Sequence, residues 1–332
     1  MVMMEIKSKI GIPKYRQIIT SIEEAIVSGV LQKGDQIPSI NEVKKEHKLS
    51  RDTVLMAFND LKNRGIIQSV VGKGYYVASE NITVAQKIFL LFDELNAFKE
   101  DLYNSFLENL GGNSQVDIFF HHFNKSIFSK LIHDNIGNYN YYVIMPANLE
   151  DTLYDIKNLP ADRVYILDQM HDDLSQYPSI YQNFNEAIFG NLTKALDRIE
   201  KYDKLILVFD KKKQPKGMLD GFLKFCGEYG LKYEVVDELK YQVLNKGELH
   251  IMPDDKSLLT LIKKVKGLQF ELGKDIGVIS YNDTLLKEIV EGGITTISTD
   301  FNAMGKRLAK MIMNKEQVQI ENPNNLIIRN SL

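Results

Sequence analysis

Few side chains of this 332-residue sequence are arranged for covalent or metal chemistry. The single cysteine, Cys226, lies in an amphipathic helical stretch, which predicts a packed side chain and not a nucleophile. The six histidines show no zinc-type spacing with Cys, Asp or Glu, and no Gly-x-Ser-x-Gly or phosphate-loop motif is present. The sequence therefore predicts a protein that is not an enzyme, with no catalytic residues, no metal ion and no cofactor.

Composition and charge distribution restrict the class of protein further. With 44% hydrophobic and 26% charged residues, the chain has the composition of an ordinary globular protein. No apolar run approaches the roughly 20 residues that cross a bilayer, and no secretory signal opens the sequence, so we expect a cytoplasmic protein without membrane contact. Residues 1–80 carry 12 basic and 9 acidic side chains, whereas the remainder carries 29 and 35. A basic head on an acidic body fits a protein that contacts nucleic acid through one end.

The basic head contains side chains that suit contacts with phosphates and base edges. Apolar residues recur at helical spacing over 14–28, and Ser39 and Ser50 each stand where a helix N-cap is expected. These signals predict helices over 14–28, 39–47 and 50–64. Because only a tight connection joins the last two, they have the pattern of a helix-turn-helix.

A β-hairpin follows these helices. Strand-like residues 66–71 and 75–78 flank Gly72-Lys73-Gly74, which places Lys73 at the tip between two glycines. The whole segment resembles the GntR family of bacterial regulators. The residues that carry the resemblance are Gly29, Leu31, Gly34-Asp35, Ile37-Pro38-Ser39, Leu49-Ser50-Arg51-x-Thr53-Val54, Ala57-Phe58-x-x-Leu61, Arg64-Gly65-Ile66-Ile67 and Gly72-x-Gly74-x-x-Val77.

The resemblance implies a winged helix whose second motif helix enters the major groove of double-stranded operator DNA. It implies that the hairpin tip meets the minor groove or the DNA backbone. Asn41 and Leu55 stand where the family often has arginine, which indicates weaker binding or a different operator. Lys44 and Lys45 are candidates for phosphate contacts. The predicted DNA-binding residues are Ser39, Asn41, Lys44, Ser50, Arg51, Thr53, Lys73 and Gly74.

Beyond residue 80 the pattern changes to short runs that are apolar on both faces, separated by helical stretches of about 10–15 residues. This alternation is typical of parallel sheets covered by helices on both sides. We therefore predict an α/β protein, with a winged helix-turn-helix followed by a two-lobed, doubly wound parallel-sheet domain. The predicted strands lie at 88–92, 116–120, 141–145, 164–167, 205–209, 233–236, 248–251 and 276–280.

The order of these signals resembles the periplasmic-binding-protein-like sensor domain of the lactose-repressor group. The stretches that carry the resemblance are 90–98, 216–222 and 273–283, followed by Ile294-Thr295-Thr296-Ile297 and Gly305-x-x-x-Ala309. The resemblance implies a ligand crevice between two lobes, at the carboxyl ends of the strands.

Candidate effector-binding residues follow the predicted strands, and Asn183 is added because it stands where the family commonly has Asp. They are Phe92, Asp93, Asn96, Phe98, His121, Asp168, Gln169, Asn183, Asn282 and Asp283. Amides and carboxylates hydrogen-bond hydroxyl groups, and aromatic rings cover the apolar face of a sugar. Met218 occupies a place where the family often has arginine, so a neutral sugar is favoured over a sugar acid.

These observations predict a ligand-responsive transcription regulator that binds operator DNA and a small effector, such as a neutral monosaccharide. Residues 1–79 are the predicted DNA-binding domain, 80–87 a linker, and 88–332 the effector-binding and dimerisation domain. A homodimer is expected from the resemblance. The alternative is a GntR-type regulator whose C-terminal domain is a degenerate enzyme-like domain or a sensor of another metabolite. A pyridoxal-phosphate-dependent aminotransferase-like domain is disfavoured because it is longer than the remaining chain.

Overall fold

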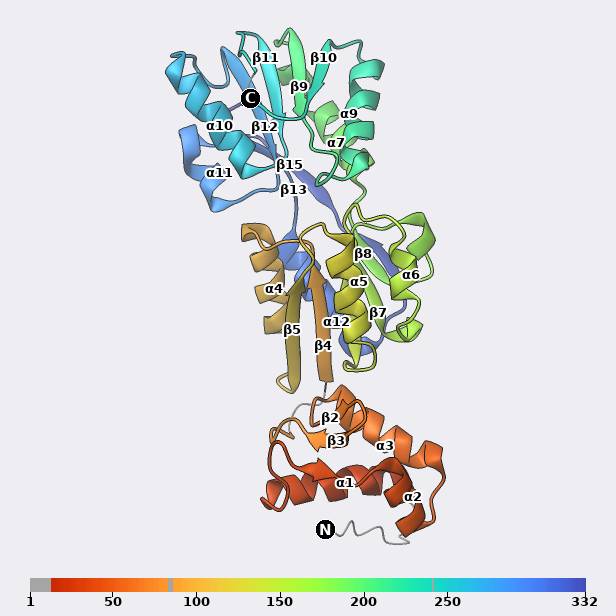
Figure 1. Ribbon diagram of the computed structural model, residues 1–332. Helices are drawn as coiled ribbons and strands as arrows, with labels where there is room; N and C mark the ends of the chain where they lie inside the picture. The colour runs from red at the N-terminus through yellow and green to blue at the C-terminus, as the bar shows by residue number, and fades with distance from the viewer. Residues whose placement is uncertain (1–12, 83–85, 241) are drawn as a thin grey trace.

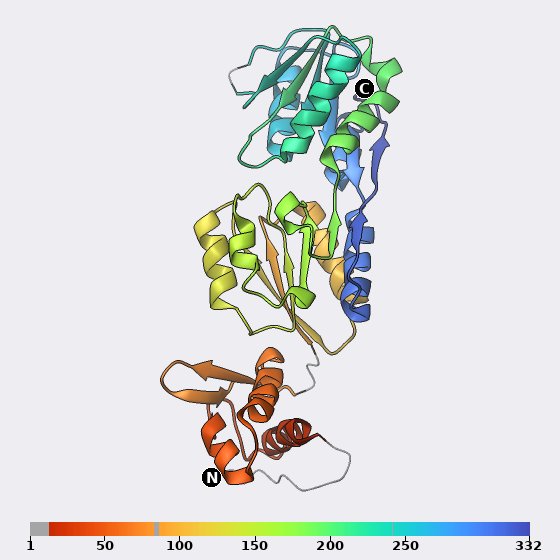
Figure 2. The same cartoon turned by 90° about the vertical axis from the view of Figure 1, so that its right-hand side faces the viewer.

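The computed structural model describes residues 13–82, 86–240 and 242–332, which form three bodies arranged in a row (Figure 1). A small helical domain with a hairpin lies at one end, and two α/β lobes follow it along the long axis of the molecule (Figures 1 and 2). The predicted fold class is confirmed. Among the described residues, no helix combines the length and the apolar character that a membrane crossing requires.

The N-terminal domain is a winged helix-turn-helix. Its elements are α1 (Lys14–Val27), β1 (Gln36–Ile37), α2 (Ile40–His47), α3 (Arg51–Asn63), β2 (Ile67–Val70) and β3 (Gly74–Val77). The antiparallel sheet has the order β1-β3-β2, and the two-residue β1 was not predicted from the sequence. Apolar residues from all three helices and the wing share one core, so the domain has a stable framework for α3.

Helix starts in this domain follow the predicted capping chemistry. The hydroxyl of Ser39 accepts a hydrogen bond from the Glu42 amide, and the Glu42 carboxylate accepts one from the Ser39 amide, which completes a capping box. The Ser50 hydroxyl accepts a hydrogen bond from the Thr53 amide and so begins α3. Lys48 connects the two helices in a left-handed conformation, with a φ of 50°.

The first lobe, called lobe 1, contains a six-stranded parallel sheet of order β14-β8-β7-β6-β4-β5. Its strands are β4 (Gln86–Phe92), β5 (Ser114–Phe120), β6 (Tyr141–Ile144), β7 (Val164–Asp168), β8 (Ser179–Tyr181) and β14 (Gln319–Glu321). Helices α4 (Ala97–Asn109) and α12 (Phe301–Asn314) cover one face, and α5 (Lys125–Asp134) and α6 (Thr152–Ile156) cover the other. Short 3-10 turns lie at Ala161–Arg163 and Asp172–Leu174.

Lobe 2 has the same architecture, with the sheet order β10-β9-β11-β12-β13-β15. Its strands are β9 (Lys204–Val208), β10 (Tyr233–Val236), β11 (Glu248–Met252), β12 (Ile276–Tyr281), β13 (Thr295–Thr299) and β15 (Asn324–Ile327), and only β15 is antiparallel to its neighbour. Its helices are α7 (Phe184–Lys194), α8 (Leu196–Ile199), α9 (Lys216–Glu228), α10 (Asp255–Gly267) and α11 (Leu285–Ile289), with a 3-10 turn at Val290–Gly292. Clusters of buried side chains lie on both faces of the sheet.

The chain passes between the lobes three times, after β8, after β13 and after β14. As a result α12 and β14 belong to lobe 1 although they follow most of lobe 2 in the sequence. Gly305 permits this return, because a Cβ atom there would clash with the carbonyl oxygen of Leu102 on α4. The two crossing helices therefore pack closely against each other.

The predicted linker at residues 80–87 overlaps the first strand of lobe 1. Gln86 and Lys87 already pair with Ser114 and Gln115 of β5, so the ladder begins two residues earlier than predicted. The remainder of the predicted linker includes residues 83–85, which lie outside the described residues.

Candidate DNA-binding surface and inter-lobe cleft

The start of α3 presents polar side chains to solvent. Arg51 is exposed at the first position of the helix, directly after the Ser50 cap. The hydroxyl groups of Ser50 and Thr53 lie 2.8 Å apart, so both are held close to the backbone. Asn41, Lys44 and Lys45 are exposed on α2, together with the acidic Glu42 and Glu46.

Of the eight predicted DNA-binding residues, Thr53 contacts the Ser50 hydroxyl and Gly74 shapes the wing turn. The other six fall into two groups. Ser39 and Ser50 accept hydrogen bonds from helix-start amides, so they shape the helix ends, whereas Asn41, Lys44, Arg51 and Lys73 have exposed side chains. Met56 is also exposed on α3 and was not predicted, although an apolar side chain on a recognition helix can contact a thymine methyl group.

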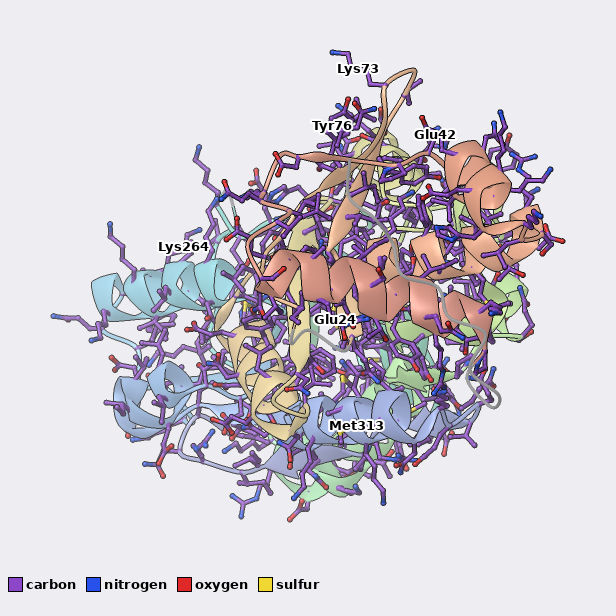
Figure 3. The ribbon with its side chains drawn as sticks, turned by 90° about the horizontal axis from the view of Figure 1, so that it is seen from below. Glu24, Glu42, Lys73, Tyr76, Lys264 and Met313 are labelled. Carbon is purple, nitrogen blue, oxygen red and sulfur yellow. The ribbon has the colours of Figure 1, made fainter. Side chains whose placement is uncertain are left out.

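The wing holds Lys73 away from the body of the protein. Gly72 and Gly74 have φ values of 73° and 110°, which only glycine adopts at low cost. The Lys73 carbonyl accepts hydrogen bonds from Gln36 Nε2 at 2.9 Å and from the Tyr76 hydroxyl at 3.3 Å. Figure 3 shows the Lys73 side chain pointing outward from the hairpin tip. Sequence reasoning missed Gln36 and Tyr76, because their contacts depend on the pairing of β1 with β3.

A cavity of about 670 Å³ lies between the two lobes. Of the ten predicted effector residues, six line it, namely Asp93, Asn96, Phe98, Asp168, Gln169 and Asn282. They come from loops that follow strands of both lobes, as expected for a ligand site at the carboxyl ends of parallel strands. The volume lies within the usual range for small-molecule sites.

Four predicted effector residues lie elsewhere, and those assignments are corrected. Phe92 is the last residue of β4 and is fully buried in the lobe 1 core. His121 is also fully buried, and its Nε2 lies 3.0 Å from the Met145 carbonyl oxygen. Asn183 caps α7 by accepting a hydrogen bond from the Glu186 amide. The fourth residue, Asp283, forms a bidentate pair with an arginine from the chain end.

That pair joins distant parts of lobe 2. The two terminal guanidinium nitrogens of Arg329, Nη1 and Nη2, each donate to the Asp283 carboxylate at 2.7 Å, and the Thr296 hydroxyl donates to it at 3.0 Å. Although burial opposes ionisation, the hydrogen bonds from Arg329 and Thr296 hold the pKa of Asp283 below its usual value. Asp283 therefore has a structural partner within lobe 2 and does not line the cavity.

On the lobe 1 side of the cavity, charged groups are buried together. The Lys99 ammonium donates to the Asp93 carboxylate, and both side chains are almost fully buried. Asp168, at the end of β7, accepts a hydrogen bond of 2.6 Å from Gln182 Nε2 and has a φ of 73°. Burial raises the pKa of Asp168, although the charge of Lys99 and the hydrogen bond from Gln182 act in the opposite direction.

On the lobe 2 side, Asn282 is 8% exposed and lines the cavity with a φ of 61°. Its side-chain amide oxygen, Oδ1, is buried and accepts no hydrogen bond from any of the described residues. Lys287 lies beneath it and donates to the Tyr281 and Asn282 carbonyl oxygens, each at 2.7 Å, while pairing with Asp255 at 2.9 Å. A left-handed residue with an unsatisfied polar atom is the kind of strained position that binding sites retain.

A hydrogen-bonded chain that includes lining residues of the cavity crosses from one lobe to the other. The Tyr281 hydroxyl donates to Gln182 Oε1 at 3.2 Å and accepts from Asn324 Nδ2 at 3.1 Å. At the rim, Asn148 of lobe 1 donates to the Gln214 carbonyl of lobe 2 at 2.5 Å. Four residues at this cavity were not predicted from the sequence, namely Lys99, Gln182, Tyr281 and Lys287, since each is recognisable only from contacts made in the folded structure.

Among the described residues, no group of three or more His, Cys, Asp or Glu side chains is placed to hold a metal ion. Burial raises the pKa of the Cys226 thiol to about 12, so this side chain is a weak nucleophile at neutral pH.

Comparison with known proteins matches two segments of the chain to families. Residues 14–77 match the gntR family of bacterial regulatory proteins, and residues 200–332 match the periplasmic binding protein-like domain. Over 100 residues the chain is 32% identical to the HTH-type transcriptional repressor YtrA of Bacillus subtilis, covering 30% of this chain and 73% of that protein. The chain belongs to the gntR family of bacterial regulatory proteins.

Other curated relatives likewise match over a short part of this chain, whereas the solved structures match over most of it. The mannosyl-D-glycerate transport/metabolism system repressor MngR of Escherichia coli is 37% identical over 82 residues, which is 25% of this chain and 34% of that protein. The chain spans as little as 15% of the length of the curated relatives that it matches. A LacI family transcriptional regulator from Silicibacter pomeroyi has a TM-score of 0.62 and 15% identity over 74% of this chain and 98% of its own. The chain thus combines a gntR-type winged helix-turn-helix with two lobes that have the LacI-like fold.

Proposed function

We propose that this protein is a ligand-responsive repressor that binds operator DNA through α3 and the wing, and a small polyhydroxylated effector between its lobes. The proposal of an effector site rests on the cavity of about 670 Å³ at the strand ends of both lobes. A monosaccharide without an anionic group suits this site. Amide and carboxylate side chains accept hydrogen bonds from hydroxyl groups, and Phe98, Phe184 and Phe301 supply aromatic surface.

The connection between the two sites follows from the topology. Effector binding across the cavity favours closure of lobe 2 onto lobe 1 by hinge motion at the three crossings. The DNA-binding domain precedes β4 of lobe 1, so a change in lobe 1 alters the position of α3 in a dimer. The effector can shift this equilibrium only by its difference in affinity for the two states. Whether it releases or enforces DNA binding depends on which state fits the operator.

The first experiment is thermal denaturation with a panel of neutral monosaccharides, amino sugars, sugar phosphates and sugar acids. A neutral sugar that raises the melting midpoint at micromolar concentration supports the effector site, because a ligand that binds only the folded state stabilises it. In parallel, affinity for DNA duplexes selected from a random pool is measured against salt concentration. DNA binding without any sugar response would contradict the effector half and leave the DNA-binding half intact.

Asn282 provides the sharpest test of where the effector binds. We expect Asn282→Gly to weaken effector binding by about tenfold or more. The variant lacks the acceptor Oδ1, so the effector's donor group is left buried without a partner, which costs roughly 1–3 kcal/mol. Glycine is preferred to alanine for this test because the φ of 61° suits glycine. The measurement is isothermal titration calorimetry with the sugar identified above. Asn183→Gly, in a residue outside the cavity, is the matched control, and equal losses in both variants would reject the assignment.

We also propose a homodimer, with α11 as part of its interface. Leu285 and Ile289 on this short helix are 78% and 75% exposed, and Leu286 beside them is partly exposed. Adjacent large apolar side chains on a surface commonly mark a site of protein association. An isologous dimer would bring two copies of α11 together and place two α3 helices on the half-sites of one operator.

The dimer is tested by a double substitution on α11. Leu285→Glu with Ile289→Glu is expected to convert a dimer to a monomer in sedimentation velocity at micromolar concentration, because four carboxylates would meet at the interface. The thermal midpoint should change little, since both side chains are exposed in the single chain. Tyr154→Glu, at an exposed position of lobe 1, is the control. A double variant that remains dimeric would show that α11 is not the interface.

A further inference from the structure

The inter-lobe cavity has an excess of negative charge. Its lining includes eight carboxylates and five lysines, and no arginine or histidine from the described residues contributes to it. Three of the lysines are already paired, since Lys99 contacts Asp93, Lys213 contacts Glu94 and Lys287 contacts Asp255. Even with all five lysines counted, the carboxylates of the lining are in excess, so the site repels an anionic ligand and attracts a cationic one.

The excess is most pronounced around Asp168, deep on the lobe 1 side. Within the described part of the chain, no lysine or arginine forms an ion pair with this carboxylate, and its side-chain hydrogen bond comes from the neutral amide of Gln182. Lys99 is close enough to act on Asp168 electrostatically, but its ammonium group is bonded to Asp93. Two carboxylates therefore share one ammonium group in a largely buried site. An incompletely compensated buried charge is costly, and a ligand that neutralises it gains affinity.

An independent observation also points to a ligand that donates hydrogen bonds. The unpartnered amide oxygen of Asn282 belongs to a side chain that is more than nine-tenths buried and lines the same cavity. An amide oxygen accepts hydrogen bonds and does not donate them. Asp168 and Asn282 come from opposite lobes, so one ligand that donates to both would favour the closed arrangement.

We infer that the effector carries a protonated primary amine on a hydroxylated carbon frame, as an amino sugar does, and that this ammonium group binds Asp168. The inference rests on the proposed effector function of the cavity and specifies its ligand class. An ammonium group has three donors and a full positive charge, so it forms charge-assisted hydrogen bonds with the carboxylate. A neutral sugar of the same shape supplies only hydroxyl donors and leaves the excess charge in place.

The test compares sugars that differ only at one substituent. D-Glucosamine, D-galactosamine and D-mannosamine are each measured by calorimetry against the corresponding neutral hexose and N-acetylated sugar, with the full-length protein. We expect at least one amino sugar to bind about tenfold or more tightly than both of its neutral partners, the difference that one charged hydrogen bond supplies. A neutral sugar that binds as tightly as its amine would overturn the inference while supporting a sugar sensor. Failure of the whole panel, with DNA binding retained, would overturn both.

The assignment to Asp168 is tested with Asp168→Asn and a matched control. The substitution keeps the shape of the side chain and removes its charge, so the preference for the amine should fall to within about threefold. Asp173→Asn removes the same charge from an exposed position of lobe 1 outside the cavity, and the preference should survive. A preference that persists in Asp168→Asn would assign the ammonium group to another carboxylate. Retention of the thermal midpoint shows that each variant folds.

Discussion

Replacing Arg51 by alanine is expected to reduce operator affinity by about a hundredfold or more. Arg51 is exposed at the start of α3, where the first residues of a recognition helix reach base edges and phosphates. A well-formed arginine contact with a base contributes roughly 1–3 kcal/mol, and a dimer on a palindromic operator loses two such contacts. The expected loss is large because Asn41 and Leu55 replace other arginines usual in the family, so fewer basic contacts remain.

The measurement is fluorescence anisotropy with the selected DNA duplex over a range of salt concentrations. If Arg51 contacts a phosphate, the dependence of log affinity on log salt decreases by about one unit per subunit. If it reads a base, the salt dependence is preserved and discrimination at one operator position is relaxed. Lys62→Ala, at the opposite end of α3, removes the same charge and serves as the control. A variant that binds as well as the parent protein would contradict the proposed role of Arg51.

Replacing Lys287 by methionine is expected to lower the free energy of unfolding by about 2–4 kcal/mol. The side chain is 1% exposed and its ammonium group donates to two carbonyl oxygens, both of which lose their donor in the variant. This loss of stability is smaller than is usual for a broken buried ion pair, because the partner Asp255 is 45% exposed and water can solvate its carboxylate. One of the two carbonyls belongs to Asn282, so effector affinity should fall as well.

Urea denaturation of the variant measures this loss, and Lys263→Met at an exposed position of α10 is the matched control. An unchanged denaturation midpoint in Lys287→Met would show that water or another group replaces the ammonium at little cost. A midpoint that falls in both variants would indicate a general effect of charge removal from lobe 2.

Local sequence signals determined the elements of this protein. Apolar residues at helical spacing predicted the three helices of the N-terminal domain, and short runs apolar on both faces predicted eight strands of the lobes. Side-chain caps at Ser39 and Ser50 marked two helix starts. These features depend on residues within a few positions of each other. The strands β1, β8, β13, β14 and β15 were not predicted. Three of them, β1, β8 and β14, have only two or three residues, and so short a strand is stabilised mainly by its neighbours in the sheet.

Only the tertiary structure decided which residues meet in the cavity. Ligands bind at the carboxyl ends of parallel strands, and six of the ten predicted effector residues line the cavity. The position of a residue after a strand does not specify the direction of its side chain. Phe92 and Asp93 are adjacent in the sequence, yet the first packs into the core and the second lines the cavity. Asp283 is held by Arg329, 46 residues later, and Lys287 is held by Asp255 on another helix. Such partners are chosen by the packing of elements that are distant in the chain, so short-range patterns carry no signal for them.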